Sequence, residues 1–503
     1  MDINIPKGLR ERPPENAYKL RRLVEILSEL FESYGYRLFI PPTYEHSDLF
    51  VLRSGEEIRE RMFVFPSKSG RKEYALRPEV TAQIARSVAL GRLNYPRPFR
   101  LYYIANVFRY EEPQRGRYRE FRQAGVELIG SDSLLADAET IELLSKAVEK
   151  AGVDDFIIGI NDVSIVKEFL KRFVEERYVP AVLTAIDRLR SLMRRGHRTT
   201  IEDELRRRNV PIDASKIKEF VSIKDPAELE TLGLDPSRLL RLFELLEDLG
   251  AKNYAFEPTI VRGLEYYTSI VYELDVPRLG GASQVAGGGR YDELIADFGG
   301  PREPCVGFAI GLDRLLEASN IDASPRPVDI VVIPLTTKRL KDILWPLREE
   351  FVTVLDVSGR KLKKALVNAL KLGAKFVVIV GEQELRDGRV IVRDLRTRTQ
   401  EAVKIEEIKE RIKSRLRFLK KSLLLPLLRI HVVPLPMLVP LLHVILRPLL
   451  GLLARPYDGD IDAHVQREYG HDRLQYREQR RFELLIGSPR KLICQPQIIH
   501  SEH

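Results

Sequence analysis

Residues 99–129 constrain the fold more than any other part of the sequence. Phe99–Phe108 is rich in aromatic and β-branched residues, which is typical of a strand. Glu120–Ile129 alternates between two faces at the period of a second strand. A polar loop separates them and is too long for a tight hairpin turn. The sequence therefore predicts an antiparallel pair of strands joined by a polar loop.

Chemistry-bearing side chains share one predicted face of this pair. Gln123 and Glu127 point the same way, and Gly125 between them has no side chain, which leaves a slot walled by an amide and a carboxylate. Fixed positive charge is expected beside the slot, from Arg109, Arg115, Arg117 and Arg119. Because guanidinium groups bind phosphates in bidentate fashion, the arrangement suits a triphosphate over a small polar substrate. Arg and Glu on a solvated strand face are the alternative.

The composition favours a soluble globular protein with a polyanionic partner. With 503 residues the chain is long enough for two to four domains. It is 31% charged and 44% hydrophobic, and its net charge of +9 favours a partner such as RNA. Cys305 and Cys494 lie far apart, so neither a disulfide framework nor a cysteine zinc site is expected. A reducing, cytoplasmic setting fits best, and no membrane association is expected.

An amphipathic helix followed by a short strand is expected near the start of the chain. Residues 16–34 place apolar side chains at helical spacing, and Gly35 ends the pattern. The strand within Tyr34–Glu45 is ended or pushed to a sheet edge by Pro41 and Pro42. These elements are consistent with a dimer interface, although the pattern alone favours an ordinary helix and strand packed in a core.

Two further segments carry candidate binding residues. Glu79 precedes a helix that begins near Thr81, where it acts either as an acidic cap or as a partner for an ammonium group. Cys305–Ala318 reads as a strand leading into a helix, with Arg314 on the first helical turn beside glycines that expose its plane to a purine or a phosphate.

The rest of the chain divides by composition. Residues from about 164 to 252 form a charged, helical insertion, whose basic runs Arg194–Arg198 and Arg206–Arg208 either touch RNA or form a solvated face. Residues 326–415 alternate strands and helices, which predicts a separate α/β domain. Residues 416–503 form an atypical Leu/Pro/Arg-rich tail. Five prolines within 423–453 would break a helix repeatedly, so the tail is expected to be neither a membrane span nor a folded domain.

Taken together, these segments resemble the histidyl-tRNA synthetases, a family of class II aminoacyl-tRNA synthetases. The resemblance covers about residues 5–415. Residues 34–45, 107–127 and 305–317 are similar to the three motifs of the class, and LRPEVTA (76–82), RGLEYYT (262–268) and GGGRYDEL (287–294) point to histidine. Val80 stands where many bacterial members have glycine, and the tail has no family counterpart.

The resemblance implies an α+β fold. It gives a class II catalytic domain over 1–325, built on an antiparallel sheet flanked by helices and interrupted by the helical insertion. A C-terminal α/β anticodon-binding domain follows over 326–415.

The resemblance also implies a role for each matching residue. The histidine-binding residues would be Glu79, Thr81, Gln123, Glu127, Tyr266 and Tyr267, with Glu127 and Tyr267 on the two imidazole nitrogens. The ATP-binding residues would be Arg109, Glu111, Arg117 and Arg314. The catalytic residues would be Arg109 and Arg262, which grip the α-phosphate. Arg262 and Tyr267 have opposite parity on a regular strand, so a bend at Gly263 is needed if both face one pocket.

The implied reaction is activation of L-histidine by ATP, with release of pyrophosphate, and transfer of histidine to the 3′ end of tRNA(His). ATP is a substrate, Mg²⁺ is expected although its ligands are unknown, and a homodimer is expected. The alternative is a non-catalytic paralogue that regulates histidine biosynthesis. Such paralogues lack the anticodon domain and lose active-site residues, whereas Arg109, Arg262, Tyr267 and the α/β segment are all present here.

Overall fold

The computed structural model describes residues 3–52, 59–113, 116–194, 196–261 and 266–417. The predictions made for Arg115, for Arg262, for the bend at Gly263 and for the tail fall outside these residues. The chain divides into two compact units, of which the second begins at Pro327.

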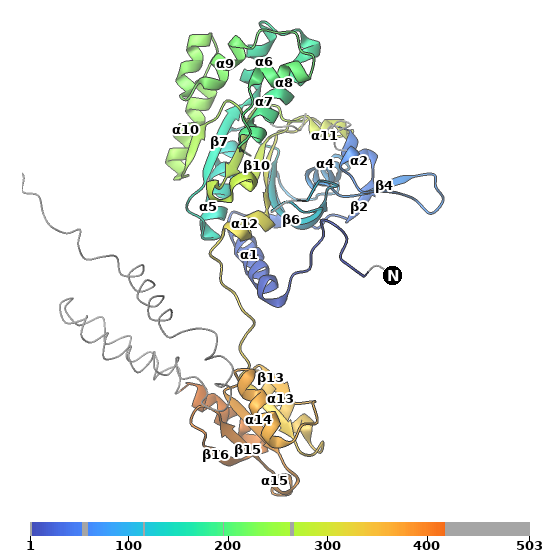
Figure 1. Ribbon diagram of the computed structural model, residues 1–503, viewed down its shortest axis with the longest axis vertical. Coiled ribbons are helices and arrows are strands. Elements are labelled where there is room, and N and C mark those ends of the chain that lie inside the picture. The colour runs from blue at the N-terminus through green and yellow to red at the C-terminus, as the bar shows by residue number, and fades with distance from the viewer. Residues whose placement is uncertain (1–2, 53–58, 114–115, 195, 262–265, 418–503) are drawn as a thin grey trace, which may run out of the picture. The chain divides into compact units, whose positions relative to one another are not determined.

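The first unit is built on an eight-stranded, mostly antiparallel sheet (Figure 1). The predicted pair of strands lies within it and is antiparallel, with Tyr103 opposite Gly125 and Leu101 opposite Glu127. From one edge to the other the strands are β1 (Arg37–Leu38), β5 (Phe99–Phe108), β6 (Glu120–Ile129), β11 (Cys305–Gly311), β10 (Gln284–Arg290), β9 (Ile270–Asp275), β7 (Ile157–Asp162) and β8 (Tyr254–Phe256). Strand β6 therefore lies between β5 and β11, although β11 follows it by about 175 residues at the sequence level.

The two faces of β6 have different neighbours. Helices α1 (Pro14–Ser33) and α5 (Leu134–Lys150) share one hydrophobic core with Ala124 and Val126, and α12 (Leu312–Ala318) joins it. The opposite face carries Gln123 and Glu127, and its core includes residues of α4 (Thr81–Ala89). Because α1 buries Leu20, Leu23, Leu27 and Phe31 at helical spacing, the predicted amphipathic helix is confirmed.

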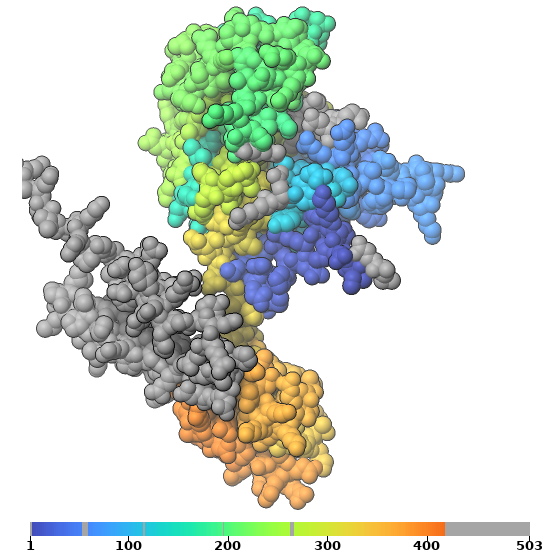
Figure 2. Space-filling model, in the orientation of Figure 1, coloured from blue at the N-terminus to red at the C-terminus, as the bar shows by residue number. Residues whose placement is uncertain are grey.

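A small antiparallel sheet lies beside α4 in the same unit. Its hairpin of β3 (Val64–Pro66) and β4 (Glu73–Leu76) projects from the unit as an arm (Figure 2), and β2 (Tyr44–His46) pairs with β4. The short helices α2 (Asp48–Val51) and α11 (Leu294–Asp297) contact α4.

Between β7 and β8 the chain is helical. The helices are α6 (Val163–Lys171), α7 (Val179–Arg194), α8 (Ile201–Arg207), α9 (Ser215–Ser222) and α10 (Ser237–Leu249), with 3₁₀ turns at η1 (Glu176–Tyr178) and η2 (Pro226–Leu232). They gather at one end of the unit, as the green part of Figure 1 shows. A further 3₁₀ turn, η3 (Pro277–Ala282), links β9 to β10.

The second unit is a five-stranded sheet with helices on both faces. The strand order is β13 (Thr353–Leu355), β12 (Ile330–Pro334), β14 (Phe376–Val380), β15 (Arg389–Asp394) and β16 (Gln400–Lys404). Its helices are α13 (Leu340–Arg348), α14 (Leu362–Lys371) and α15 (Glu382–Arg386), and after η4 (Ile405–Glu407) residues 408–417 are helical. Strand β16 was not predicted, because its sequence alternates too few apolar side chains to signal a strand. Nowhere in the described chain is there a helix with the length and apolar character needed to cross a bilayer.

Candidate active site

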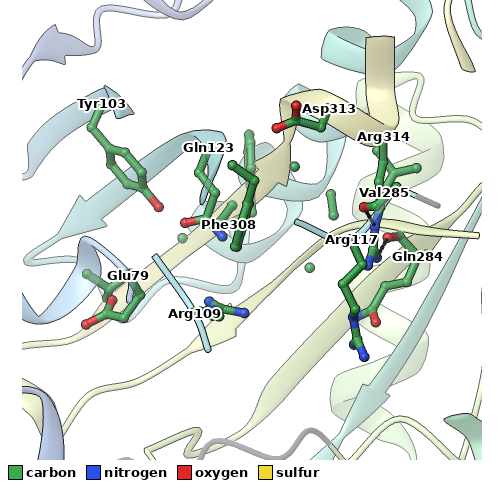
Figure 3. A pocket seen from close by; sticks show the side chains of 18 of the residues that line it. Glu79, Tyr103, Arg109, Arg117, Gln123, Gln284, Val285, Phe308, Asp313 and Arg314 are labelled. Atoms are coloured by element: carbon green, nitrogen blue, oxygen red, sulfur yellow. Dashed lines mark hydrogen bonds between the residues drawn. The ribbon is translucent and has the colours of Figure 1, made fainter. Parts of the chain in front are cut away.

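A pocket of about 210 Å³ opens on the Gln123 face of the large sheet (Figure 3). The polar and aromatic residues that line it come from β5, β6, β10, β11, the starts of α4 and α12, and the segments beside β6 and β9: Glu79, Thr81, Tyr103, Arg109, Glu111, Arg117, Tyr118, Phe121, Gln123, Glu127, Tyr266, Tyr267, Gln284, Tyr291, Phe308, Asp313 and Arg314. Figure 3 shows Glu79 and Tyr103 at one end and Arg117 and Arg314 at the other, with Phe308 between them. The pocket therefore has an acidic end and a cationic end.

Glu127 is the buried carboxylate of the acidic end. Only 1% of its surface is exposed, and it accepts hydrogen bonds from the Thr81 hydroxyl at 2.6 Å and from the Tyr291 hydroxyl. Burial raises its pKa from 4.5 to about 8, although these two hydrogen bonds oppose the rise, and the charge of Glu79 adds to it. A buried carboxylate with a raised pKa gains most from a ligand that brings positive charge or donated hydrogen bonds.

Glu79 supplies a second buried carboxylate at the start of α4. Its two oxygens accept from the Ala82 amide at 3.1 and 3.2 Å, which satisfies one of the amides that the first helical turn leaves without a partner. Burial raises its pKa, with the Ala82 hydrogen bond and the charge of Arg109 acting in the opposite direction. The capping interpretation is therefore correct, and the same carboxylate also faces the pocket.

Gln123 has an acceptor atom that the protein leaves unused. Its Oε1 is buried and has no hydrogen-bond partner among the described residues. Leaving a buried acceptor unsatisfied costs about 1–3 kcal/mol. A ligand that donates a hydrogen bond to this oxygen would recover that free energy.

Two glycines give the acidic end its space. A Cβ at Gly125 would approach Phe308 O within 2.6 Å and would collide with the ring of Tyr103. A Cβ at Gly307 would collide with the Glu127 carboxylate. Because Gly125 and Gly307 have no side chains, the side chains of Tyr103 and Glu127 can reach the pocket.

Tyr266 and Tyr267 wall the same end. Each is 7% exposed, and their ring centroids are 4.8 Å apart. Tyr266 also packs edge-on against Tyr291, with the centroids 5.8 Å apart. A planar ligand that enters here is bounded by aromatic surfaces.

Three arginines from separate segments supply the positive charge of the pocket, with Arg117 and Arg314 at the cationic end and Arg109 between the two ends (Figure 3). Arg109 Nε donates to Pro78 O at 2.9 Å, Arg117 Nε lies 2.8 Å from Glu111 Oε2, and Arg314 Nε donates to Gly116 O at 2.9 Å. Burial lowers the pKa of Arg314 to about 10, and the charge of Arg117 adds to the effect. Charges that repel one another in a buried site favour binding of an anion.

Most of the predicted site residues that the structure describes line this pocket. Arg115 and Arg262 lie outside the described residues. Arg119, expected beside the slot, donates instead to Glu111 O at 3.2 Å and stacks 3.9 Å from the centre of the Tyr110 ring.

Lining residues that the sequence did not single out include Tyr103, Gln284, Tyr291, Phe308 and Asp313. Tyr103 lies directly opposite Gly125, so knowledge of the cross-strand register would have placed it on the same face as Gln123. The others belong to β10 and β11 or follow them, and they reach the site only through pairing with β6.

The arrangement suits the activation of a small amino acid by a nucleoside triphosphate. The buried carboxylates, the free amide oxygen and the tyrosines match a polar substrate that carries positive charge, and the arginines match a polyphosphate. A mostly antiparallel sheet with such a pocket, followed by a separate α/β unit, is the architecture of a class II aminoacyl-tRNA synthetase.

Comparisons with known proteins support this class and specify it. The family described as histidyl-tRNA synthetase matches residues 8–315, and the anticodon binding domain matches residues 329–415. A histidine–tRNA ligase of Archaeoglobus fulgidus is 41% identical over 419 residues, which cover 81% of this chain and 99% of the relative. One from Pyrococcus furiosus is 39% identical over 436 residues, which cover 82% and 100%. The crystal structure of histidyl-tRNA synthetase from Nostoc sp. PCC 7120 has a TM-score of 0.63 at 25% identity and covers 82% of this chain and all of the other.

The chain belongs to the histidyl-tRNA synthetase family. The predicted family, fold class and kind of enzyme are thereby confirmed.

Proposed function

We propose that this chain activates histidine with ATP and transfers it to tRNA. The acidic end of the pocket would bind histidine and the cationic end would bind ATP. The observation that carries the proposal is the meeting of Gln123 and Glu127 with Arg109, Arg117 and Arg314 in one cavity, from segments about 190 residues apart. Such convergence of opposite charges is not required by the fold.

The acidic end is assigned to histidine. The α-ammonium group would donate to Glu79 and to the unused Oε1 of Gln123, with Thr81 alongside. Neutral imidazole has one donor and one acceptor nitrogen, and Glu127 with Tyr267 satisfies both. The Tyr291 hydroxyl donates a hydrogen bond to the Glu127 carboxylate, and the ring of Tyr266 packs against the ring of Tyr267. Amino acids without both nitrogens would leave buried groups unpaired and be rejected strongly.

The cationic end is assigned to ATP. Arg109, between the two ends in Figure 3, is placed on the α-phosphate together with Arg262, and Arg117 and Arg314 on the remainder of the nucleotide. The histidine carboxylate attacks the α-phosphorus, a bond to that oxygen forms, and the bond to the pyrophosphate oxygen breaks. A carboxylate is a nucleophile at neutral pH, so the step needs positioning and positive charge rather than a general base.

Mg²⁺ is proposed to accompany ATP. Among the described residues there is no group of three or more His, Cys, Asp or Glu side chains that could hold a metal ion. Magnesium commonly binds through only one or two carboxylates together with substrate phosphates. Glu111 lines the pocket beside Arg117 and fits that requirement, so it would hold the ion together with the phosphates. The magnesium ion would then neutralise negative charge on the leaving pyrophosphate.

In the second step a hydroxyl of the terminal ribose of tRNA(His) attacks the activated carbonyl carbon and AMP leaves. The second unit, which matches an anticodon binding domain over residues 329–415, is assigned to the anticodon. The division proposed is a catalytic domain over 1–325 with an insertion at about 164–252, and an anticodon-binding domain over 326–415. Because the substrate is tRNA, we place the reaction in the cytoplasm.

The active species is proposed to be a homodimer. Large apolar side chains are exposed around β1 and the small sheet: Leu38, Ile40, Tyr44, Val64 and Phe65. Large apolar side chains that form an exposed patch on a protein commonly mark an interaction site. A second copy of the chain would cover these five side chains.

The test of the proposed function is histidine-dependent exchange of labelled pyrophosphate into ATP in the presence of Mg²⁺. We expect exchange with histidine and background levels with phenylalanine or glutamine, which match its size without its two nitrogens. Folded protein that supports no exchange with histidine would refute the proposed function.

A substitution at Arg262 distinguishes a role in catalysis from a role in histidine binding. Arg262→Ala is expected to lower exchange by roughly two to three decades, as loss of one transition-state donor typically does, while histidine binding measured by calorimetry survives. Loss of histidine binding together with exchange would assign Arg262 to substrate holding instead.

A further inference from the structure

The last helical turns of α7 carry two arginines that reach the large sheet. Arg190 Nη1 lies 3.0 Å from Glu257 Oε2, and its other nitrogens lie 3.3 Å from Glu273 and 3.1 Å from Asp275. Arg194 contacts Glu273 and lies 2.8 Å from Asp275. These five residues are called the α7 clamp below. The sequence interpretation of Arg194 as part of an RNA-facing or solvated run is wrong, since its side chain is 18% exposed and paired with carboxylates.

The α7 clamp continues into the pocket through Gln284, the first residue of β10. Arg194 Nη1 donates to Gln284 Oε1 at 3.3 Å, and Gln284 Nε2 donates to Glu273 Oε1 at 2.8 Å. The main-chain oxygen of Gln284 accepts from Arg314, the contact drawn as a dashed line in Figure 3. A continuous set of hydrogen bonds therefore joins α7 to the cationic end of the pocket.

The sheet pairs Gln284 with Asp275, but at an irregular end of the ladder. Its pairing with β9 changes register between Gln284 and Ala286, so the regular ladder begins only after it. The side-chain contacts of Gln284 with Arg194 and Glu273 add a second constraint on its position. Since Glu273 and Asp275 are buried, their ion pairs with Arg194 are shielded from water and hold one geometry more firmly than surface pairs would.

We propose that Arg194 is a positioning residue for ATP. Arg194 and Glu273 hold the Gln284 side chain, Gln284 offers its carbonyl to Arg314, and Arg314 is thereby oriented toward the nucleotide. The helical insertion and the nucleotide end of the pocket are coupled through this route. The inference rests on the proposed function, because it assigns Arg314 to ATP.

The experiment measures the affinities of the full chain for Mg²⁺-ATP and for histidine separately, by calorimetry. Arg194→Met keeps the length of the side chain and removes its charge. We expect ATP affinity to fall roughly tenfold, as for other contact networks of this kind, while histidine affinity stays within about twofold. Arg188→Ala, which removes an exposed cation from the same helix, is the matched control and should bind both ligands like the wild type.

A double substitution distinguishes coupling from general damage. Arg194→Met and Gln284→Ala act on one route, so together they should weaken ATP binding little more than either alone. Unchanged ATP affinity in Arg194→Met, additive losses in the double variant, or equal losses for ATP and histidine would each overturn the proposal. If Arg194→Met does not fold by circular dichroism, Gln284→Ala alone decides: selective loss of ATP affinity supports the proposal and unchanged affinity refutes it.

The proposed function is tested independently of the Arg194 and Gln284 variants. A wild-type protein that binds ATP but supports no histidine-dependent exchange refutes the synthetase reaction, and the ATP affinities still decide the role of Arg194.

Discussion

Replacing Glu127 with glutamine should stabilise the protein at alkaline pH while lowering its activity. In the folded chain the pKa of Glu127 is raised to about 8, chiefly by burial, from an ordinary value of 4.5. The folded state therefore binds the proton more tightly than the unfolded state does. The stabilisation linked to that proton is complete below about pH 4.5 and is lost as the pH rises through about 8.

The magnitude follows from the two pKa values. At about 1.36 kcal/mol for each pH unit, the rise from 4.5 to about 8 corresponds to roughly 5 kcal/mol of unfolding free energy at pH 9. Glutamine carries no charge at any pH, and its amide can accept from Thr81 as Glu127 does. We therefore expect similar stabilities at pH 5 and a more stable Glu127→Gln variant at pH 9, by up to that amount.

The assay is guanidinium unfolding followed by circular dichroism at intervals from pH 5 to pH 9. Glu29→Gln, which alters an exposed glutamate of α1, controls for the general effect of removing one carboxylate. Parallel pH profiles for the wild type and Glu127→Gln would refute the reasoning, because they would place the Glu127 pKa near its ordinary value. Histidine-dependent exchange by the same variant should fall by about one to two decades, the range for losing a hydrogen bond to a charged group.

Three other outcomes are expected. Gln123→Ala should weaken histidine binding by roughly one to two decades and leave ATP affinity unchanged, as measured by calorimetry, since the amide oxygen is assigned to the ammonium group; equal affinity for histidine would remove Gln123 from that role. Ile40→Glu places a charge at a side chain that is 81% exposed, and it should shift the protein from dimer to monomer in light scattering. An unchanged molecular mass would show that the dimer interface does not include Ile40. Truncation after Arg417 should preserve exchange, because the described lining of the pocket comes from residues 79–314, and loss of folding would show that the tail is required.

The spacing of polar and apolar side chains along the sequence predicted individual strands and helices correctly. The alternation of Glu120–Ile129 placed Gln123 and Glu127 on one face, because side chains in a strand repeat every two residues. The helix at residues 14–33 followed from its apolar spacing. The family resemblance then supplied residue roles that spacing could not.

What the sequence did not reveal depends on contacts between distant segments. Tyr291 reaches Glu127 only because β10 and β6 both pair with β11, and nothing in the residues around Tyr291 encodes that register. Arg194 lies in a basic run, which predicts an RNA-facing or solvated surface, whereas its carboxylate partners follow it by about 80 residues. Strand β16 carries mostly polar side chains at the edge of its sheet, where burial does not impose an apolar pattern.

The position of β6 between β5 and β11 has a consequence for synthesis on the ribosome. At 5–20 residues per second, the roughly 175 residues between Ile129 and Cys305 take about 10–35 s to translate. During that time the hairpin of β5 and β6 exists with one strand edge unpaired, and such an edge invites pairing with other nascent chains. Newly made protein should therefore depend on chaperones until β11 emerges from the exit tunnel and closes the sheet.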